Sequence, residues 1–293
     1  MKRLLTPERL RTLLIFLLVL AQLPCAASAK DAPLCDTLAL RGAWVATVAG
    51  LDYPRTPTAD AEELRRRCTE ILDGVRAAGL NAVFLQVRPA ADALYESALF
   101  PWSASLTGEA GRAPEDGFDP LAYWVSEAHA RGLELHAWIN PLRVTTGGTE
   151  DAPKTPDGLA ENSPARLHPE WVVRYGGNLY FDPGFPEVRA LVVDGAAEIA
   201  EKYDVDGIHL DDYFYPGRDF DDRASMELYA SAGQTEDDWR RANITALIEA
   251  LDTAIHAIDP ALSFGVSPAG IWANDTTMDE GSATSGGESY TQQ

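Results

Sequence analysis

The chain has 293 residues and carries 45 Asp and Glu against 24 Lys and Arg, a net charge of -21. Hydrophobic residues make up 46% of it, a globular composition that excludes a disordered or collagen-like chain. An acidic balance of this size removes the attraction to phosphate backbones, so we expect no nucleic-acid partner. A neutral or cationic ligand fits this charge better.

The first 29 residues have the three regions of a secretory signal peptide. A basic start leads into the apolar stretch 13–20 and then into Ala27-Ser28-Ala29, an A-x-A cleavage site. We expect cleavage after Ala29, which leaves residues 30–293 as a secreted or periplasmic protein with no membrane span. An uncleaved anchor is one alternative, but the apolar run is shorter than the ~20 residues that a spanning helix needs. Lipidation at Cys25 is the other, and Pro24 argues against it.

Two cysteines remain in the mature chain, Cys35 and Cys68. An oxidising compartment would allow them to form a disulfide. The sequence does not show whether the two thiols meet, so a bridge and two free thiols both stay open. Neither cysteine lies in a metal-ligand spacing, and cysteine catalysis is not expected.

Hydrophobic periodicity along the mature chain alternates between the strand and the helix pattern. The expected strands are residues 42–48, 82–88, 133–140, 207–213 and 262–267. The expected helices between them are residues 60–78, 120–131, 186–202 and 235–258. Four helical crossovers between five strands predict a parallel sheet in an α/β fold.

Alternation within these strands favours a TIM-type (β/α)8 barrel over an open doubly wound sheet. One parity of each strand is apolar and the other is largely polar, which places a polar row on the face opposite the helices. The rows are Phe84, Gln86 and Arg88; His136, Trp138 and Asn140; His209, Asp211 and Tyr213; and Ser263, Gly265 and Ser267. Open doubly wound sheets bury both faces under helices, so this row predicts the interior of a barrel.

The barrel is expected to be incomplete, because five strands are found where closure needs eight. Residues 276–293 are polar, are rich in Gly, Ser and Thr, and indicate a loop-like tail. Residues 30–293 would then form a partial barrel whose C-terminal strands are missing, and we expect this chain alone to be inactive. A smaller open fold, complete in five strands, is the alternative.

The carboxyl ends of barrel strands converge on one pocket, which predicts the candidate site. The residues at these ends are Arg88, Asn140, Asp211, Tyr213 and Ser267. A carboxylate can act as nucleophile, base or acid at a glycosidic centre, Arg and Asn bind hydroxyls, and aromatic rings stack on sugars. For Asp211, an ion pair with Arg88 is the alternative to catalysis.

For three further residues, the sequence is compatible with either a structural or a chemical role. Asp212 has the opposite parity to Asp211, so a helix cap or a loop contact competes with a catalytic role. His136 and His209 lie deeper in their rows, where hydrogen-bonded core histidines are expected.

The first strand reads RGAWVATV and lacks the H-x-H pair of metal-dependent hydrolase barrels, so we expect no metal and no other cofactor.

From about Arg41 onward, six segments resemble a known family in their order and sequence. They are RGAWVATVAGLDYP, NAVFLQVRPAADALYESALFPWSASLTG, GLELHAWINPLRV, HPEWVV with LYFDPGFPEVR, VDGIHLDDYFYP and FGVSPAGIW. With these segments the chain resembles the glycosyl-hydrolase-like family 10, bacterial secreted TIM barrels related to the divisome glycosidase that cleaves denuded peptidoglycan. The resemblance implies hydrolysis of a polysaccharide in the bacterial cell wall, or of a related β-linked amino-sugar glycan.

The family pattern also implies roles for individual residues. Asp211 and Asp212 would be catalytic, and the cleft would be lined by Arg88, Asn140, Arg143 and Tyr213. The candidates for stacking on the sugar are Trp102, Trp138 and Trp272, each of which could instead anchor the core or a loop.

The chain departs from the family pattern at its end, because no segment corresponds to the P-Q-x-Y-W-like motif of family barrels. Glycosidases normally use two carboxylates, and only Asp211 is placed from the sequence. The second could be Asp212, could come from a loop such as that containing Asp182, or could belong to the missing strands. A glycan-binding or inactive relative therefore remains the alternative to an enzyme.

Overall fold

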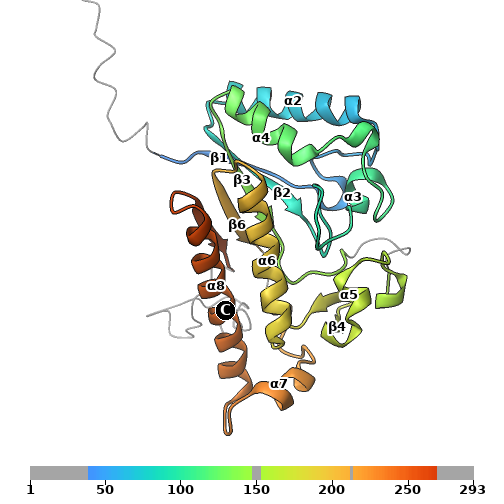
Figure 1. Cartoon of the computed structure of the whole chain (residues 1–293), viewed down its shortest axis with the longest axis vertical. Coiled ribbons are helices and arrows are strands. Elements are labelled where there is room, and N and C mark those ends of the chain that lie inside the picture. The colour runs from blue at the N-terminus through green and yellow to red at the C-terminus, as the bar shows by residue number, and fades with distance from the viewer. Residues whose placement is uncertain (1–38, 147–152, 212–213, 269–293) are drawn as a thin grey trace, which may run out of the picture. The chain divides into compact units, whose positions relative to one another are not determined.

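The computed structural model describes residues 39–146, 153–211 and 214–268 (Figure 1). The chain divides into two units, Met1–Leu40 and Arg41–Gln293, and the fold described below is that of the second unit. Several sequence predictions fall outside the described residues: the signal peptide, Cys35, Asp212, Tyr213, Trp272 and the tail at 276–293. Cys68 is a buried free thiol. Within the described ranges, no helix has the length and apolar character needed to cross a membrane.

One sheet of five parallel strands, in the order β1-β2-β3-β6-β7, forms the centre of the unit. The strands are β1 (Gly42–Val45), β2 (Ala82–Arg88), β3 (Glu134–Ile139), β6 (Gly207–Asp211) and β7 (Ser263–Ser267). All five predicted strands are therefore confirmed, and so is their parallel pairing, although β1 ends at Val45, three residues before its predicted end. As described, the sheet is open, with β1 and β7 as its edges.

The predicted helices follow the strands with their ends within one residue of the expected positions. They are α2 (Ala61–Ala77), α4 (Pro120–Ala130), α6 (Pro186–Lys202) and α8 (Glu236–Ile258). The side chains of Asp60, Asp119 and Thr235 cap three of them by accepting backbone N–H groups of the first turn. The apolar parity of β2, β3 and β6, including Leu85, Ile139 and Leu210, is buried in the core, as expected for the face that the helices cover. In β7, Phe264 and Val266 are partly buried against that core.

An antiparallel hairpin that was not predicted from the sequence lies in the connection between β3 and α6. Its strands are β4 (Val172–Tyr175) and β5 (Asn178–Phe181), and they are joined by Gly176-Gly177. Both glycines have positive φ, 56° and 87°, which is the backbone of a two-residue hairpin turn. Two glycines between short apolar runs were the signal that could have revealed it.

The other missed elements are short. They are the α-helices α3 (Ala104–Thr107), α5 (Pro164–Leu167) and α7 (Arg223–Tyr229), and the 3-10 helices η1 (Val48–Gly50), η2 (Glu115–Gly117), η3 (Pro156–Gly158) and η4 (Pro169–Trp171). All of them lie in connections that leave the carboxyl end of a strand. The long connections therefore lie at the carboxyl ends of the strands, which we call the carboxyl edge of the sheet, as in barrels that carry their site there.

Aromatic rings cover the face of the sheet opposite the helices. Trp44 stacks on Phe84 at 4.8 Å between ring centroids and meets Trp138 and His209 edge-on, each at 4.9 Å. Phe84 stacks in turn on His136 at 4.6 Å. The imidazole of His209 is 2.7 Å from the hydroxyl of Ser267. Both histidines thus have the structural roles expected from their depth in the strands.

Gly207 makes room for this aromatic layer, and its replacement tests the packing. A Cβ at Gly207 would lie 2.4 Å from Nδ1 of His136 and 2.7 Å from the carbonyl oxygen of Ser263. We expect Gly207→Ala to lower the free energy of unfolding by about 1–3 kcal/mol, because the strand backbone cannot move away cheaply. Gly74→Ala in α2 is the control, since its Cβ meets nothing within 4 Å. Equal thermal melting temperatures for the two variants would contradict this packing.

The buried imidazole of His209 makes the stability of the fold depend on pH. Burial, together with the nearby His136, lowers the pKa of His209 to about 4. The folded state thus disfavours the protonated imidazole, while the unfolded chain titrates near ~6.5. Stability is expected to fall as the pH drops from about 6.5 to about 4, because the unfolded state then binds the proton more readily. NMR titration of His209 should give a midpoint near 4, and a midpoint above 6 in the folded protein would disprove it.

Candidate active site

A chain of buried amides joins the carboxyl ends of four strands. Oε1 of Gln86 accepts the backbone N–H groups of Thr47 and Val48, at 2.8 Å and 2.9 Å, and the Thr47 hydroxyl donates to the Gln86 carbonyl at 2.9 Å. Nε2 of Gln86 donates to Oδ1 of Asn140 at 2.6 Å. Nδ2 of Asn140 then donates to the backbone carbonyl of Asp211 at 3.1 Å. We call Thr47, Gln86, Asn140 and the Asp211 carbonyl the amide chain.

The amide chain is removed from water, since Thr47, Gln86 and Asn140 are each at most 1% exposed. A buried amide without partners costs several kcal/mol, so these groups hold one arrangement in which all of them are bonded. The ends of β1, β2, β3 and β6 are therefore fixed relative to one another. Sequence reasoning placed Asn140 at this site but missed Thr47 and the bonds of Gln86.

Asp211 ends β6 on the same face as His209, two residues earlier. It is partly buried and pairs in register with Ser267 of β7, whose hydroxyl contacts His209. The structure thus brings Asn140, Asp211 and Ser267 together at one edge of the sheet, as predicted. Asp212 and Tyr213, the next predicted site residues, and Trp272 lie outside the described residues.

The prediction that Arg88 lines the cleft is wrong, because β2 contains a bulge. Gln86 pairs with Trp138, but Arg88 pairs with Ile139, so one extra residue reverses the parity between Gln86 and Arg88. The guanidinium lies 3.6 Å from the centroid of the Phe100 ring and against Gly195 of α6, on the helix side of the sheet. Burial lowers the pKa of Arg88.

The alternative ion pair between Arg88 and Asp211 is excluded by the same bulge, since the two side chains lie on opposite faces. A hydrophobic pattern of period two cannot reveal a bulge. The face on which Arg88 lies therefore follows from the pairing of β2 with β3 and not from the sequence pattern of β2.

The remaining predicted residues take different positions. Trp138 is 8% exposed and packs edge-on against Trp44, so its ring is part of the aromatic layer rather than an open platform. Trp102 is partly buried, packs against the core in the connection after β2, and forms a β-bridge with Ala93. Arg143 is half-buried in the connection after β3, and its backbone forms an antiparallel β-bridge with Tyr180 of the hairpin. Trp102 and Arg143 thus lie in connections at the carboxyl edge.

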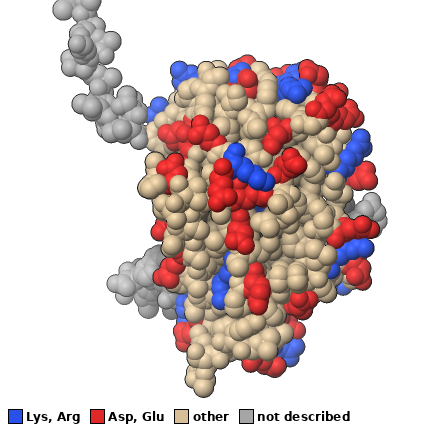
Figure 2. Space-filling view, in the orientation of Figure 1, with Lys and Arg blue, Asp and Glu red and all other residues tan. Residues whose placement is uncertain are grey.

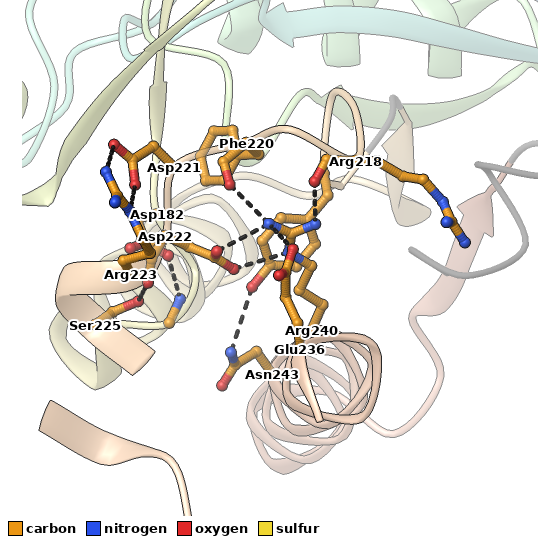
Figure 3. Close-up of polar contacts among 12 residues, drawn as sticks. Asp182, Arg218, Phe220, Asp221, Asp222, Arg223, Ser225, Glu236, Arg240 and Asn243 are labelled. Atoms are coloured by element: carbon orange, nitrogen blue, oxygen red, sulfur yellow. Dashed lines mark hydrogen bonds and ion pairs between the residues drawn. The ribbon is translucent and has the colours of Figure 1, made fainter. Parts of the chain in front are cut away.

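Asp182, the loop carboxylate considered as a catalytic partner, is buried in a second polar cluster. It is 1% exposed and accepts the N–H of Gly184 at 2.8 Å. Burial raises its pKa to about 6. Figure 3 shows it beside Ser225 and Asp222, in the cluster that also contains Arg240. Its described contacts are thus with the loops and α7, away from the amide chain.

The chemistry available at the carboxyl edge is that of a carbohydrate site. Asp211 offers a carboxylate and Ser267 a partly exposed hydroxyl, and aromatic rings lie beneath them. Asn140, which was predicted to line the cleft, is 1% exposed and bonded to Gln86 and to the Asp211 carbonyl, so it positions Asp211 instead. Carboxylates perform acid, base and nucleophilic steps at glycosidic centres, while amides and hydroxyls bind sugar hydroxyls. In the described part of the chain, no three His, Cys, Asp or Glu side chains gather in a way that could hold a metal ion.

Comparison with known proteins agrees with this chemistry. Residues 39–290 match the family model "Glycosyl hydrolase-like 10". The chain is 43% identical over 253 residues to the glycosyl hydrolase YngK of Bacillus subtilis, a match covering 85% of this chain and 48% of that protein. It is 37% identical over 264 residues to the glycosyl hydrolase DigH of Escherichia coli, a match covering 86% of this chain and 60% of that protein. The chain thus spans about half the length of the curated relatives that it matches.

The fold is shared with a solved glycosidase. An alpha-L-fucosidase from Paenibacillus thiaminolyticus superposes with a TM-score of 0.52 at 17% identity, covering 81% of this chain and 34% of the fucosidase. At this identity the likeness concerns the fold alone, and it supports the predicted TIM-type α/β architecture, although the described strands do not close into a barrel. By the family match and by the identity to its relatives, this chain belongs to the glycosyl hydrolase-like 10 family.

Proposed function

We propose that the protein hydrolyses glycosidic bonds in a bacterial cell-wall or related polysaccharide, with Asp211 as a catalytic carboxylate. The observation that carries the proposal is the amide chain, which binds the backbone of Asp211 itself through Asn140. A carboxylate at a strand end is useful in catalysis only if its position is fixed to within a fraction of an ångström. The buried amides supply that constraint at the edge where TIM-type barrels hold their sites.

Asp211 would supply one of the two carboxylates that glycosidases normally need. As a nucleophile it would lie about 5 Å from its partner, and the configuration at the sugar would be retained. As the general acid/base of a retaining enzyme it would lie at the same distance, whereas in an inverting enzyme the two carboxylates would be roughly 6.5–9.5 Å apart, with room for a water molecule. The proposed partner is Asp212 or a carboxylate outside the described residues, because Asp182 is enclosed by the second cluster.

The proposed substrate is an amino-sugar polysaccharide, such as peptidoglycan strands stripped of their peptides. The chain carries a net charge of -21, and acidic side chains are spread over the face shown in Figure 2. Such a surface repels polyanions and keeps peptide carboxylates at a distance. The stripped strand keeps one lactyl carboxylate on each N-acetylmuramic acid, so this surface favours it only over strands that also carry acidic peptides. The hydroxyls of its uncharged N-acetylglucosamine units suit the carboxylate of Asp211 and the hydroxyl of Ser267.

Export is part of the same proposal, since cell-wall glycan lies outside the cytoplasm. N-terminal sequencing of protein from the periplasm or medium should find a terminus at Lys30, because the A-x-A site would be cleaved after Ala29. Replacing Ala27 and Ala29 with bulky residues should leave an uncleaved precursor. An intact Met1 terminus on cytoplasmic protein would refute the export step.

The catalytic role of Asp211 is tested by Asp211→Asn in the longest natural protein that contains this sequence. The change keeps size and removes the charge, so we expect kcat on peptide-stripped glycan strands to fall about 10²–10⁴-fold with little change in melting temperature. New reducing ends measure the rate. Asp204→Asn is the control, because Asp204 precedes β6 at its other end and its side chain is 95% exposed.

Retention of more than about a tenth of wild-type kcat by Asp211→Asn, a difference of under ~1.4 kcal/mol in barrier, would exclude the assigned role. Binding of glycan strands by the wild-type protein without any new reducing ends would favour the alternative, a glycan-binding relative without hydrolytic activity.

A further inference from the structure

Arg240 of α8 binds the segment that follows β6 with almost every donor of its guanidinium group. Nε and one terminal nitrogen donate to the two carboxylate oxygens of Asp222, at 2.9 Å and 2.8 Å. The terminal nitrogens also donate to the carbonyls of Arg218 and Phe220, at 2.8 Å and 2.7 Å. Figure 3 shows the guanidinium between α8 and this segment. We call residues 214–222 the post-β6 segment.

The Arg240–Asp222 pair is buried, with both side chains 2% exposed. Removing two charges from water costs about as much as their attraction returns, so such a pair adds little net stability. The pair does fix the relative positions of its partners, because a planar guanidinium can donate to a carboxylate and two carbonyls in only one arrangement. The position of Arg240 on α8 thus determines the path of the post-β6 segment.

A second arginine binds the neighbouring loop in the same way. One nitrogen of Arg189, on α6, donates to the carbonyls of Pro183 and Gly184, at 2.5 Å and 3.2 Å, and to Oδ1 of Asn243 at 3.1 Å. Nδ2 of Asn243, one turn beyond Arg240, donates to the hydroxyl of Tyr215 at 3.3 Å. The two arginines are therefore connected through α8 and hold two adjacent loops.

The two loops pack closely against each other. A Cβ at Gly184 would lie 2.1 Å from the hydroxyl of Ser225 and 2.9 Å from a carboxylate oxygen of Asp182. The Ser225 hydroxyl donates to the carbonyl of Asp222, the residue that Arg240 binds. Displacement of either loop would therefore disturb the other.

We propose that Arg240 is a positioning residue, which holds the post-β6 segment and through it fixes the carboxyl end of β6 where Asp211 stands. The inference rests on the proposed function for its catalytic consequence. The charged groups that face Arg240 are Asp222 at the end of the segment, Glu236 one turn earlier on α8, and Asp182 in the loop before α6. It acts from the helix side, while the amide chain holds the Asp211 carbonyl from the other face.

The test compares Arg240→Lys with Arg241→Lys, the same substitution at the next residue of α8. Lysine keeps the charge beside Asp222 but cannot bind its carboxylate and two carbonyls together. Arg241 is 40% exposed and pairs only with the exposed Asp238 among its described contacts. In Arg240→Lys we expect hydrogen exchange in peptides covering 207–222 to speed up about tenfold or more, with α2 unchanged. Arg241→Lys should leave both regions unchanged.

Activity provides the second measurement. A displaced catalytic group slows the chemical step more than it weakens binding, so kcat of Arg240→Lys should fall about tenfold or more while KM stays within about threefold. The double variant Arg240→Gln with Asp222→Asn removes both charges and leaves neither one buried without a partner. It should keep a cooperative thermal melt and still lose kcat.

Unchanged exchange and unchanged kcat in Arg240→Lys would overturn the proposal. A loss of kcat that matches the unfolded fraction in the melt would overturn it too, since the role would then be stability alone. If the wild-type protein hydrolyses no glycan, the proposed function fails, and the exchange measurement still decides whether Arg240 holds the β6 end.

Discussion

The hydrogen bond from Gln86 to Asn140 is the interaction on which the carboxyl edge of the sheet depends. Each amide has both a donor and an acceptor, so two of them in sequence can connect the Thr47 turn to the end of β6 without any charge. A parallel sheet by itself fixes strands only through backbone bonds, and those end where the strands end. The side-chain amides extend the order beyond the last backbone pair.

The connections at the amino ends of the strands are short, whereas those at the carboxyl ends are long and carry the candidate site. Helices α2 and α4 return to their next strands through short turns, with Gly79 and Gly132 in the left-handed conformation just past the helix ends. The hairpin and the short helices α3, α5 and α7 all lie in connections on the opposite edge. The amino edge therefore contributes stability through regular turns, whereas the carboxyl edge contributes the polar groups and the loops that a ligand could meet.

The parts predicted correctly from the sequence are those with a local cause. The strand at Ala82–Arg88 and the helix at Pro186–Lys202 have the expected bounds, because periodicity and turn residues act within a few positions. The Arg88 error has a different origin, since the bulge in β2 is set by how the strand pairs with β3. The arginine contacts of α6 and α8 join residues far apart in sequence, and no local pattern predicts which carbonyl an arginine binds.

Neutral amides hold the Asp211 backbone from one face of the sheet, and in the proposed arrangement the Arg240–Asp222 pair holds it from the other. If the inner face used carboxylates or lysines, their ionisation would change with pH and would couple to Asp211, the proposed catalytic carboxylate. Gln86 and Asn140 do not titrate, and burial keeps His209 neutral near pH 7. The charged groups that hold the loops, Arg240 and Asp222, lie on the helix side of the sheet. The backbone beneath Asp211 is therefore held on its inner face by side chains that do not change charge near pH 7. In the proposed mechanism, the ionisation of Asp211 would be set by its substrate and by the second carboxylate.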